Sequence, residues 1–199
     1  VIAGPAFRGE PLFAAAVEGV PEYRSDGQIE NFIGEVDDAL AMVDGAMKLP
    51  QVKAGKFGIV GHSFGSGVGL LVAARSKQVA CVVSYDAWLT NPFQFYWERL
   101  AAELEQDAKE YLWGSWGPYL DQPAKKQLQG LMARSIVHHA DRIEAPVLLL
   151  LGGAYPGYVR SAYHSSHKQL AAALKQHKKT FKFKIIPGGG HNFVLYYQR

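Results

Sequence analysis

The sequence has one cysteine, no long hydrophobic run and little net charge. Because Cys81 is the only cysteine in 199 residues, no disulfide can form within the chain. Its place in the apolar run VACVVSY predicts an unreactive thiol in the core. No run approaches the about 18 apolar residues that a membrane-spanning helix needs, and no signal peptide is visible. The chain begins at Val1 without a methionine, which leaves its compartment open.

Charge gives little reason to expect a charged partner. The formal net charge is +3, which is too small to indicate nucleic-acid binding. Lysines do gather near the C-terminus, and we interpret them as a solvated helix face and strand edge. Attraction to an anionic membrane surface or substrate is the alternative interpretation. These lysines are Lys168, Lys175, Lys178, Lys179, Lys182 and Lys184.

Strand-like and helix-like segments alternate along the chain. Nearly continuous apolar runs predict buried parallel strands at 56–60, 79–85, 145–152 and 181–187, the last at an edge. Helical spacing of apolar residues is found at 29–47, 65–75 and 167–177. This alternation predicts an α/β fold, with a mostly parallel sheet and helices on both faces. At 199 residues, we expect a single domain over 1–199.

Two regions interrupt this alternation. Residues 89–135 are rich in aromatics and contain a helix-like middle, so we interpret them as a lid-like insertion over an active site. Simple packing of these aromatics onto the sheet is the alternative. The N-terminal region offers one strand fragment and possibly a second strand at 12–18. A complete enzyme of the type inferred below has more strands there, so we expect a chain shortened at its start.

A serine lies between glycines in FGIVGHSFGSG (57–67), after a predicted strand and before a predicted helix. Gly61-His62-Ser63-Phe64-Gly65 fits the G-x-S-x-G pattern of a nucleophile elbow. A tight strand-to-helix turn brings strand and helix together, and we expect Gly61 and Gly65 to remove the resulting collisions. The elbow predicts that Ser63 is a nucleophile at the carboxyl edge of the sheet, beside a helix N-terminus.

A serine hydroxyl needs a base to accept its proton, and the chain has seven histidines. His191 follows the last predicted strand through a glycine-rich loop, which can deliver an imidazole to the serine, so His191 is our predicted base. His62 lies inside the elbow and is expected to support the turn. His164 and His167 are three residues apart on a helix, but no third ligand has metal-binding spacing. We therefore expect these two to face solvent and predict no metal site.

The base needs a carboxylate to fix its tautomer. In this architecture the acid commonly follows the next-to-last strand, but the chain has Tyr155 at that place. Asp86 instead lies just past the strand 79–85, which we expect to neighbour the strand that precedes Ser63. Asp86 is therefore the predicted acid, and a turn or capping residue is the alternative.

These motifs resemble the α/β-hydrolase superfamily over roughly residues 55–199. The C-terminal half is similar to dienelactone-hydrolase-like and prolyl-oligopeptidase-like members. The spacing of GHSFGSG, VVSYDAW and GGGHNF resembles the platelet-activating-factor acetylhydrolase group, in which the acid follows the strand after the nucleophile. That resemblance implies Ser63, Asp86 and His191 as the triad. It also implies that Phe64 and Trp88 line an acyl pocket.

The chain departs from that group at two places. Ser66 stands where a second glycine is usual, and the His-Gly oxyanion loop is replaced by AGPAFRG, in which Pro5 has no N–H to donate. The backbone N–H of Phe64 is therefore the one oxyanion donor we name firmly. A second donor is expected from Ala6 or Phe7.

The predicted function is hydrolysis of carboxylic esters through an acyl-enzyme, without metal or organic cofactor. The substrate is expected to be a small-molecule or lipid-like ester with an apolar acyl or aryl group. Three alternatives are left open: a dienelactone-type hydrolase, a peptidase, and a hydrolase-fold receptor that binds without turnover. The sequence predicts no nucleic-acid partner, and contact with a membrane surface stays open.

Overall fold

The computed structural model describes residues 1–10, 24–53, 55–88, 90–93, 123–154 and 157–191. Contacts divide the chain into two compact units, Val1–Gly55 and Lys56–Arg199. We describe each unit by itself. Within the described residues, no helix is both long and apolar enough to span a bilayer.

The first unit contains one described helix, α1 (Ile33–Ala46). The prediction placed its start at 29, but Asn31 and Phe32 have positive φ values of 51° and 87°, which prevent an earlier start. The buried Glu35 carboxylate accepts the backbone N–H groups of Glu30 and Phe32, each at 2.8 Å. This bonding supplies acceptors at a helix start, where the helix itself provides none. The buried face of α1 carries Val36, Ala39 and Val43.

Arg8 holds the N-terminal stretch of this unit against α1. Its guanidinium binds both oxygens of Asp38, at 3.0 and 2.7 Å, and Glu30 at 2.7 Å. These hydrogen bonds lower the pKa of the Asp38 carboxyl. The stretch AGPAFRG is thereby anchored within the first unit, while the role of Ala6 or Phe7 as oxyanion donor stays a prediction.

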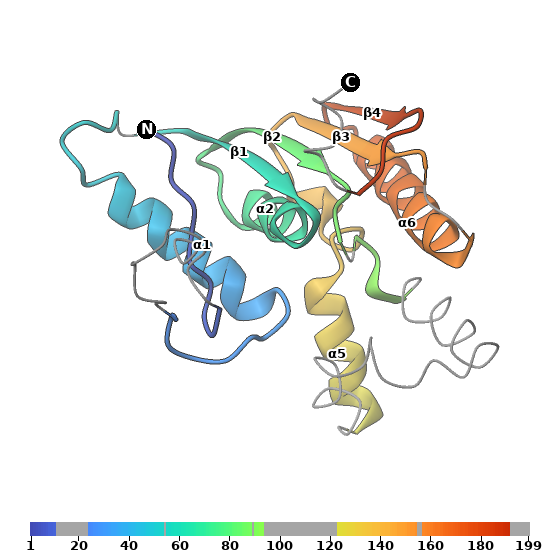
Figure 1. Cartoon of the computed structure of the whole chain (residues 1–199), viewed down its shortest axis with the longest axis horizontal. Coiled ribbons are helices and arrows are strands. Elements are labelled where there is room, and N and C mark those ends of the chain that lie inside the picture. The colour runs from blue at the N-terminus through green and yellow to red at the C-terminus, as the bar shows by residue number, and fades with distance from the viewer. Residues whose placement is uncertain (11–23, 54, 89, 94–122, 155–156, 192–199) are drawn as a thin grey trace, which may run out of the picture. The chain divides into compact units, whose positions relative to one another are not determined.

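The second unit is built on a four-stranded parallel sheet with strand order β1-β2-β3-β4 (Figure 1). The strands are β1 (Phe57–His62), β2 (Val79–Tyr85), β3 (Val147–Gly152) and β4 (Phe181–Ile186). All pairs are parallel, so every carboxyl end lies at one edge of the sheet. The four predicted strands are confirmed, and the predicted edge strand is β4, at one end of the described sheet.

Helices cover the sheet between the strands. The described elements are α2 (Ser63–Arg75), α5 (Ala124–Arg134), the short 3₁₀ helix η2 (Ala140–Arg142) and α6 (Gly157–Gln176). α2 packs on β1 and β2, and α6 packs on β3 and β4. A Cβ at Gly69 would come within 2.7 Å of the Ile59 side chain, so this glycine lets α2 lie close to β1.

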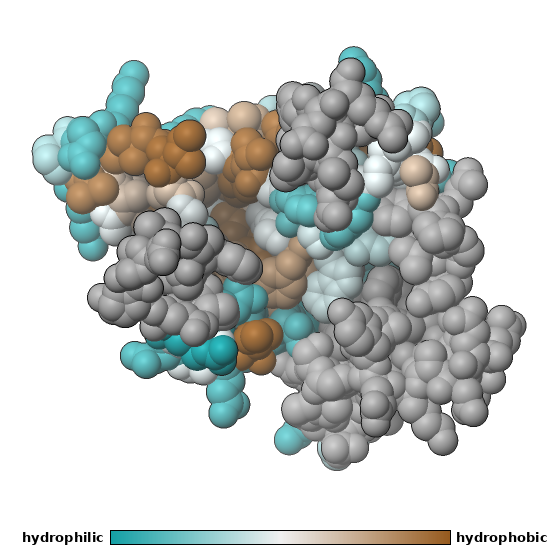
Figure 2. All heavy atoms as spheres, in the orientation of Figure 1, coloured by the Kyte–Doolittle hydropathy of each residue, from teal (hydrophilic) through white to brown (hydrophobic). Residues whose placement is uncertain are grey.

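One face of the sheet carries the exposed side chains of the strands. The strand register places Val60, Cys81, Lys182 and Lys184 on the same face, and all four are exposed. Figure 2 shows hydrophobic residues at the surface in the region where Figure 1 draws β1 and α2, and Val60 is 85% exposed. The prediction of Cys81 as a core thiol is therefore wrong. In the run VACVVSY, Cys81 lies on the face of the strand that described side chains do not cover.

Most of the predicted insertion at 89–135 lies outside the described residues. The described parts are 90–93 and the segment from 123 onward, which contains α5. The possible strand at 12–18 also lies outside them. The lid-like role of the insertion and the single domain over 1–199 stay predictions.

Candidate active site

Ser63 occupies a tight turn between β1 and α2. It is the first residue of α2 and has a positive φ of 51°, which side chains rarely adopt. A Cβ at Gly61 would lie 2.6 Å from the Ser66 Cα, so the turn requires glycine there. The expectation for Gly65 is wrong, because a Cβ at Gly65 would meet no described neighbour within 4 Å. The backbone N–H of Trp88 donates to the Ser63 carbonyl at 3.0 Å, which joins the elbow to the segment after β2.

Asp86 follows β2 directly and is fully buried. Its backbone also has a positive φ, 48°, and its N–H donates to the Leu150 carbonyl at 3.0 Å. Oδ1 accepts the Gly152 N–H at 2.6 Å, while Oδ2 lies 3.4 Å from Nδ1 of His191. A buried carboxylate needs such partners to offset its lost hydration. The structure thus brings the predicted acid and the predicted base together.

His191 lies in the segment that follows β4, and we name residues 187–191 the histidine loop. Its side chain is 37% exposed. The imidazole of His62, next to Ser63, lies 4.7 Å from that of His191 between ring centroids. Tyr163 of α6 approaches His191 edge-on at 6.1 Å. The predicted base therefore lies close to His62, the residue that precedes the predicted nucleophile.

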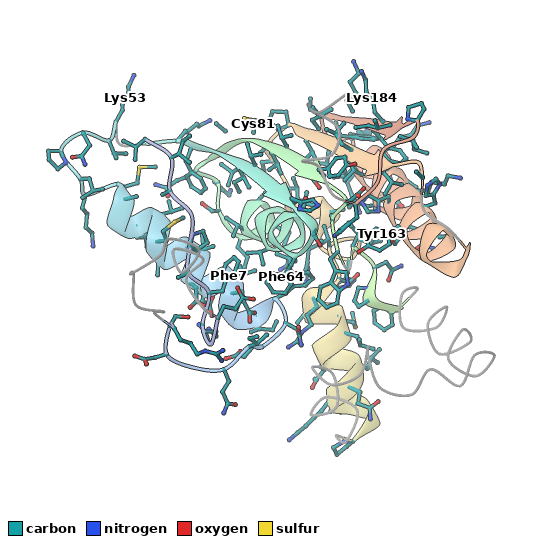
Figure 3. The ribbon with its side chains drawn as sticks, in the orientation of Figure 1. Phe7, Lys53, Phe64, Cys81, Tyr163 and Lys184 are labelled. Carbon is teal, nitrogen blue, oxygen red and sulfur yellow. The ribbon has the colours of Figure 1, made fainter. Side chains whose placement is uncertain are left out.

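Two aromatic side chains lie together beside Ser63. The rings of Phe64 and Trp88 are 5.8 Å apart between centroids and inclined at 37°, and both side chains are half-buried. Phe64 comes from the first turn of α2, and Trp88 from the segment after β2. Figure 3 shows Phe64 beside α2 and Tyr163 beside α6. The pair forms an apolar surface next to Ser63, on residues the sequence predicts to line an acyl pocket.

His167 is buried in α6, although the sequence predicted that it faces solvent. Its Nδ1 lies 2.8 Å from the Tyr163 carbonyl. Because a carbonyl only accepts, Nδ1 carries the proton. Nε2 is then a buried acceptor that no hydrogen bond satisfies among the described residues. Burial lowers the pKa of His167 to about 4. The helical spacing showed which residues share a face, but not that this face turns inward.

Sequence reasoning missed side chains that bind the histidine loop. His62 Nε2 donates to the His191 carbonyl at 2.6 Å, and the Tyr85 hydroxyl donates to the Gly190 carbonyl at 2.5 Å. His62 was expected to support only its own turn. These contacts join residues more than 100 positions apart, so no local pattern reveals them. Within the described part of the chain, no three His, Cys, Asp or Glu residues are grouped to hold a metal ion.

A serine on a strand-to-helix turn, with a buried aspartate and a histidine at the carboxyl edge of a parallel sheet, defines the class as an α/β-hydrolase. Within that class the chain belongs to the family described as BAAT / Acyl-CoA thioester hydrolase C terminal, whose model matches residues 41–198. A search of curated proteins gave no match.

Solved structures share the fold. A puromycin-hydrolysing peptidase of Mycobacterium tuberculosis matches at a TM-score of 0.61 with 23% identity, over 82% of this chain and 23% of that one. Pyrococcus horikoshii acylaminoacyl peptidase matches at 0.60 with 15% identity, over 86% and 27%. Porphyromonas gingivalis dipeptidyl peptidase 4 matches at 0.60 with 20% identity, over 84% and 22%. The chain therefore spans about a quarter of the length of these proteins.

Proposed function

We propose that this chain is a serine hydrolase that cleaves carboxylic esters of apolar acyl groups through an acyl-enzyme. The observation that carries the proposal is the buried Asp86 carboxylate, 3.4 Å from His191, beside a serine elbow. Asp86 holds the His191 imidazole in the tautomer that has its proton on Nδ1. The other nitrogen, Nε2, is then an acceptor for the Ser63 proton.

The reaction takes place in two stages. Ser63 Oγ attacks the ester carbonyl carbon while His191 accepts the serine proton, and the carbonyl oxygen becomes negative. The backbone N–H of Phe64 and the N-terminal end of α2 stabilise that charge. His191 then donates its proton to the leaving alcohol, which gives the acyl-enzyme. In the second stage His191 takes a proton from water while the water oxygen attacks the acyl carbon. His191 then returns that proton to Ser63 Oγ as the Oγ–acyl bond breaks, which releases the acid and restores the Ser63 hydroxyl.

The position of the acid supports a particular arrangement of the triad. Asp86 lies 23 residues after Ser63 (86 minus 63) and follows the strand next to the nucleophile strand. This spacing resembles the platelet-activating-factor acetylhydrolase group. Tyr155, at the commoner acid position, lies outside the described residues. A phenol with an ordinary pKa near 10 supplies no negative charge at neutral pH.

The Phe64–Trp88 pair supports an apolar acyl group. Two aromatic rings in contact beside the nucleophile bind alkyl or aryl groups better than charged ones. The family description favours a second candidate, a thioester substrate, in which sulfur replaces oxygen in the leaving group. The peptidase neighbours make amide cleavage a third outcome to test. A hydrolase-fold receptor predicts covalent labelling of Ser63 without turnover.

The test compares Ser63→Ala with the wild-type chain on matched oxygen esters, thioesters and amides. We expect turnover of oxygen esters by the wild type, and loss of about 10⁴-fold or more in kcat for the variant. A fluorophosphonate probe should label the wild type but not the variant. Equal labelling of the two proteins would exclude Ser63 as the nucleophile. Labelling of the wild type with no turnover of any substrate would favour the receptor.

A further inference from the structure

The histidine loop crosses the carboxyl edge of the sheet one strand at a time. Three successive carbonyls of the loop each accept a hydrogen bond from the end of a different strand. The pairs are Gly189 with Ala154 N after β3 (2.9 Å), Gly190 with the Tyr85 hydroxyl at the end of β2 (2.5 Å), and His191 with His62 Nε2 at the end of β1 (2.6 Å).

Chain geometry explains why side chains are needed to reach the loop from β2 and β1. Neighbouring strands lie about 4.8 Å apart, and an extended chain advances about 3.3–3.6 Å per residue. Crossing from β3 to β1 covers two such intervals, about 9.6 Å, whereas the two steps from residue 189 to residue 191 advance at most about 7.2 Å. The side chains of Tyr85 and His62 reach toward the loop over the remaining distance, so their hydrogen bonds help to decide which residue stands beside Asp86.

Two of the three donors are side chains, and they are partners in the sheet. His62 pairs with Tyr85 in the register of β1 and β2, so both side chains share one face and one level. Tyr85 is 4% exposed, and its ring lies 5.7 Å from that of His62. The Ala154 bond comes from the main chain and is the same for almost any residue. The two side-chain bonds depend on the residue type.

We propose that His62 and Tyr85 are positioning residues that hold the histidine loop across the sheet and keep the His191 imidazole within reach of Asp86. Because the His191 carbonyl can only accept, His62 acts through a proton on Nε2. Neither residue takes part in the chemistry, and both act through His191. This inference rests on the proposed function for its kinetic readout only.

The test uses a pair of amide variants that differ in reach. The side-chain nitrogen of His62→Gln is as many bonds from Cβ as Nε2, whereas the nitrogen of His62→Asn is one bond shorter. We expect His62→Asn and Tyr85→Phe each to lower kcat about tenfold with KM changed less than twofold, as expected for a lost hydrogen bond. His62→Gln should restore kcat to within about threefold of wild type. His177→Ala, at an exposed remote histidine, is the control.

Hydrogen–deuterium exchange of the peptide covering 187–191 gives a readout without substrate. Exchange should be faster in Tyr85→Phe and His62→Asn than in the wild type, and slow again in His62→Gln, with unfolding temperatures compared in parallel. Equal exchange in all variants, or equal kcat in the Gln and Asn variants, would overturn the positioning role. If Ser63→Ala retains activity, the proposed function fails while the exchange result still decides the role of His62 and Tyr85.

Discussion

Asp86 divides its two carboxylate oxygens between two neighbours. Oδ1 accepts the Gly152 N–H at the end of β3, and Oδ2 faces His191. The backbone bond fixes the rotation of the carboxylate, so the second oxygen is directed without help from solvent. A fully buried carboxylate held in this way supplies a fixed negative charge beside His191, the predicted base.

Asp86→Asn tests that charge while keeping the shape of the side chain. The amide oxygen can still accept the Gly152 N–H, but the amide group presented to His191 favours the wrong tautomer. We expect kcat to fall by about 10⁴-fold with little change in KM, measured with a nitrophenyl ester. Tyr155→Phe is the matched control and should change kcat less than twofold. A wild-type kcat in Asp86→Asn, or a large loss in Tyr155→Phe, would assign the acid elsewhere.

At the scale of elements, α6 carries an uncharged histidine into the core. The folded pKa of His167, about 4, lies below its ordinary value of 6.5. Between these two values the unfolded chain binds a proton that the folded chain does not. The stabilisation from burying neutral His167 is therefore complete above about pH 6.5 and is lost as the pH falls toward 4.

This sign predicts that the free energy of unfolding falls as the pH falls, and that His167→Asn weakens this pH dependence. The wild type should lose up to about 3 kcal/mol of unfolding free energy between pH 7 and pH 4 from this residue, measured by urea unfolding. His167→Asn removes the titrating group and should show a shallower pH dependence. His177→Asn, at an exposed histidine, should keep the wild-type slope. Identical slopes for the wild type and His167→Asn would show that His167 does not titrate on unfolding.

The contact between α2 and the segment after β2 predicts chain-length selectivity. Trp88→Ala removes one ring of the Phe64–Trp88 pair and should lower kcat/KM more for long acyl esters than for acetyl esters. Each buried methylene contributes about 0.8 kcal/mol, or roughly fourfold. The measurement is kcat/KM for nitrophenyl esters of rising acyl length, with the acetyl ester as internal control. An equal loss at every length would give Trp88 a structural role only.

At the scale of the whole molecule, the sequence predicts the strands of the sheet better than it predicts the helices and loops around them. The four strands are predicted within two residues of their observed ends, because buried parallel strands have nearly continuous apolar runs. The start of α6 is missed by ten residues, since GYVRSAYHSS (157–166) holds three serines, two tyrosines and a glycine, which have weak helix propensity. The contact of Asp86 with His191 could be predicted because two neighbouring strands end together, while the role of Asp86 as the acid stays a prediction. The Tyr85 contact depends on a distant loop, so sequence reasoning misses it.

The alkylation rate of the Cys81 thiol measures how accessible the exposed face of the sheet is to solvent. In the native chain we expect its thiol to react stoichiometrically with an alkylating reagent, at a rate within about tenfold of that in urea. Cys81→Ser is the control for labelling at other groups. Protection of the native thiol that only denaturant removes would mean that this face is covered in solution. Because Cys81 is distant along β2 from Asp86, alkylation should leave ester turnover unchanged.

The positive φ of Ser63 lowers the thermal stability of the folded chain, whereas the proposed turnover requires the serine hydroxyl at that position. A side chain in the left-handed region costs about 1 kcal/mol relative to glycine, and Ser63 bears that cost in every folded molecule. Ser63→Gly should therefore unfold at a higher temperature than Ser63→Ala, although both lack the hydroxyl. The same comparison predicts that a hydrolase fold that no longer needs this hydroxyl gains stability from glycine at position 63.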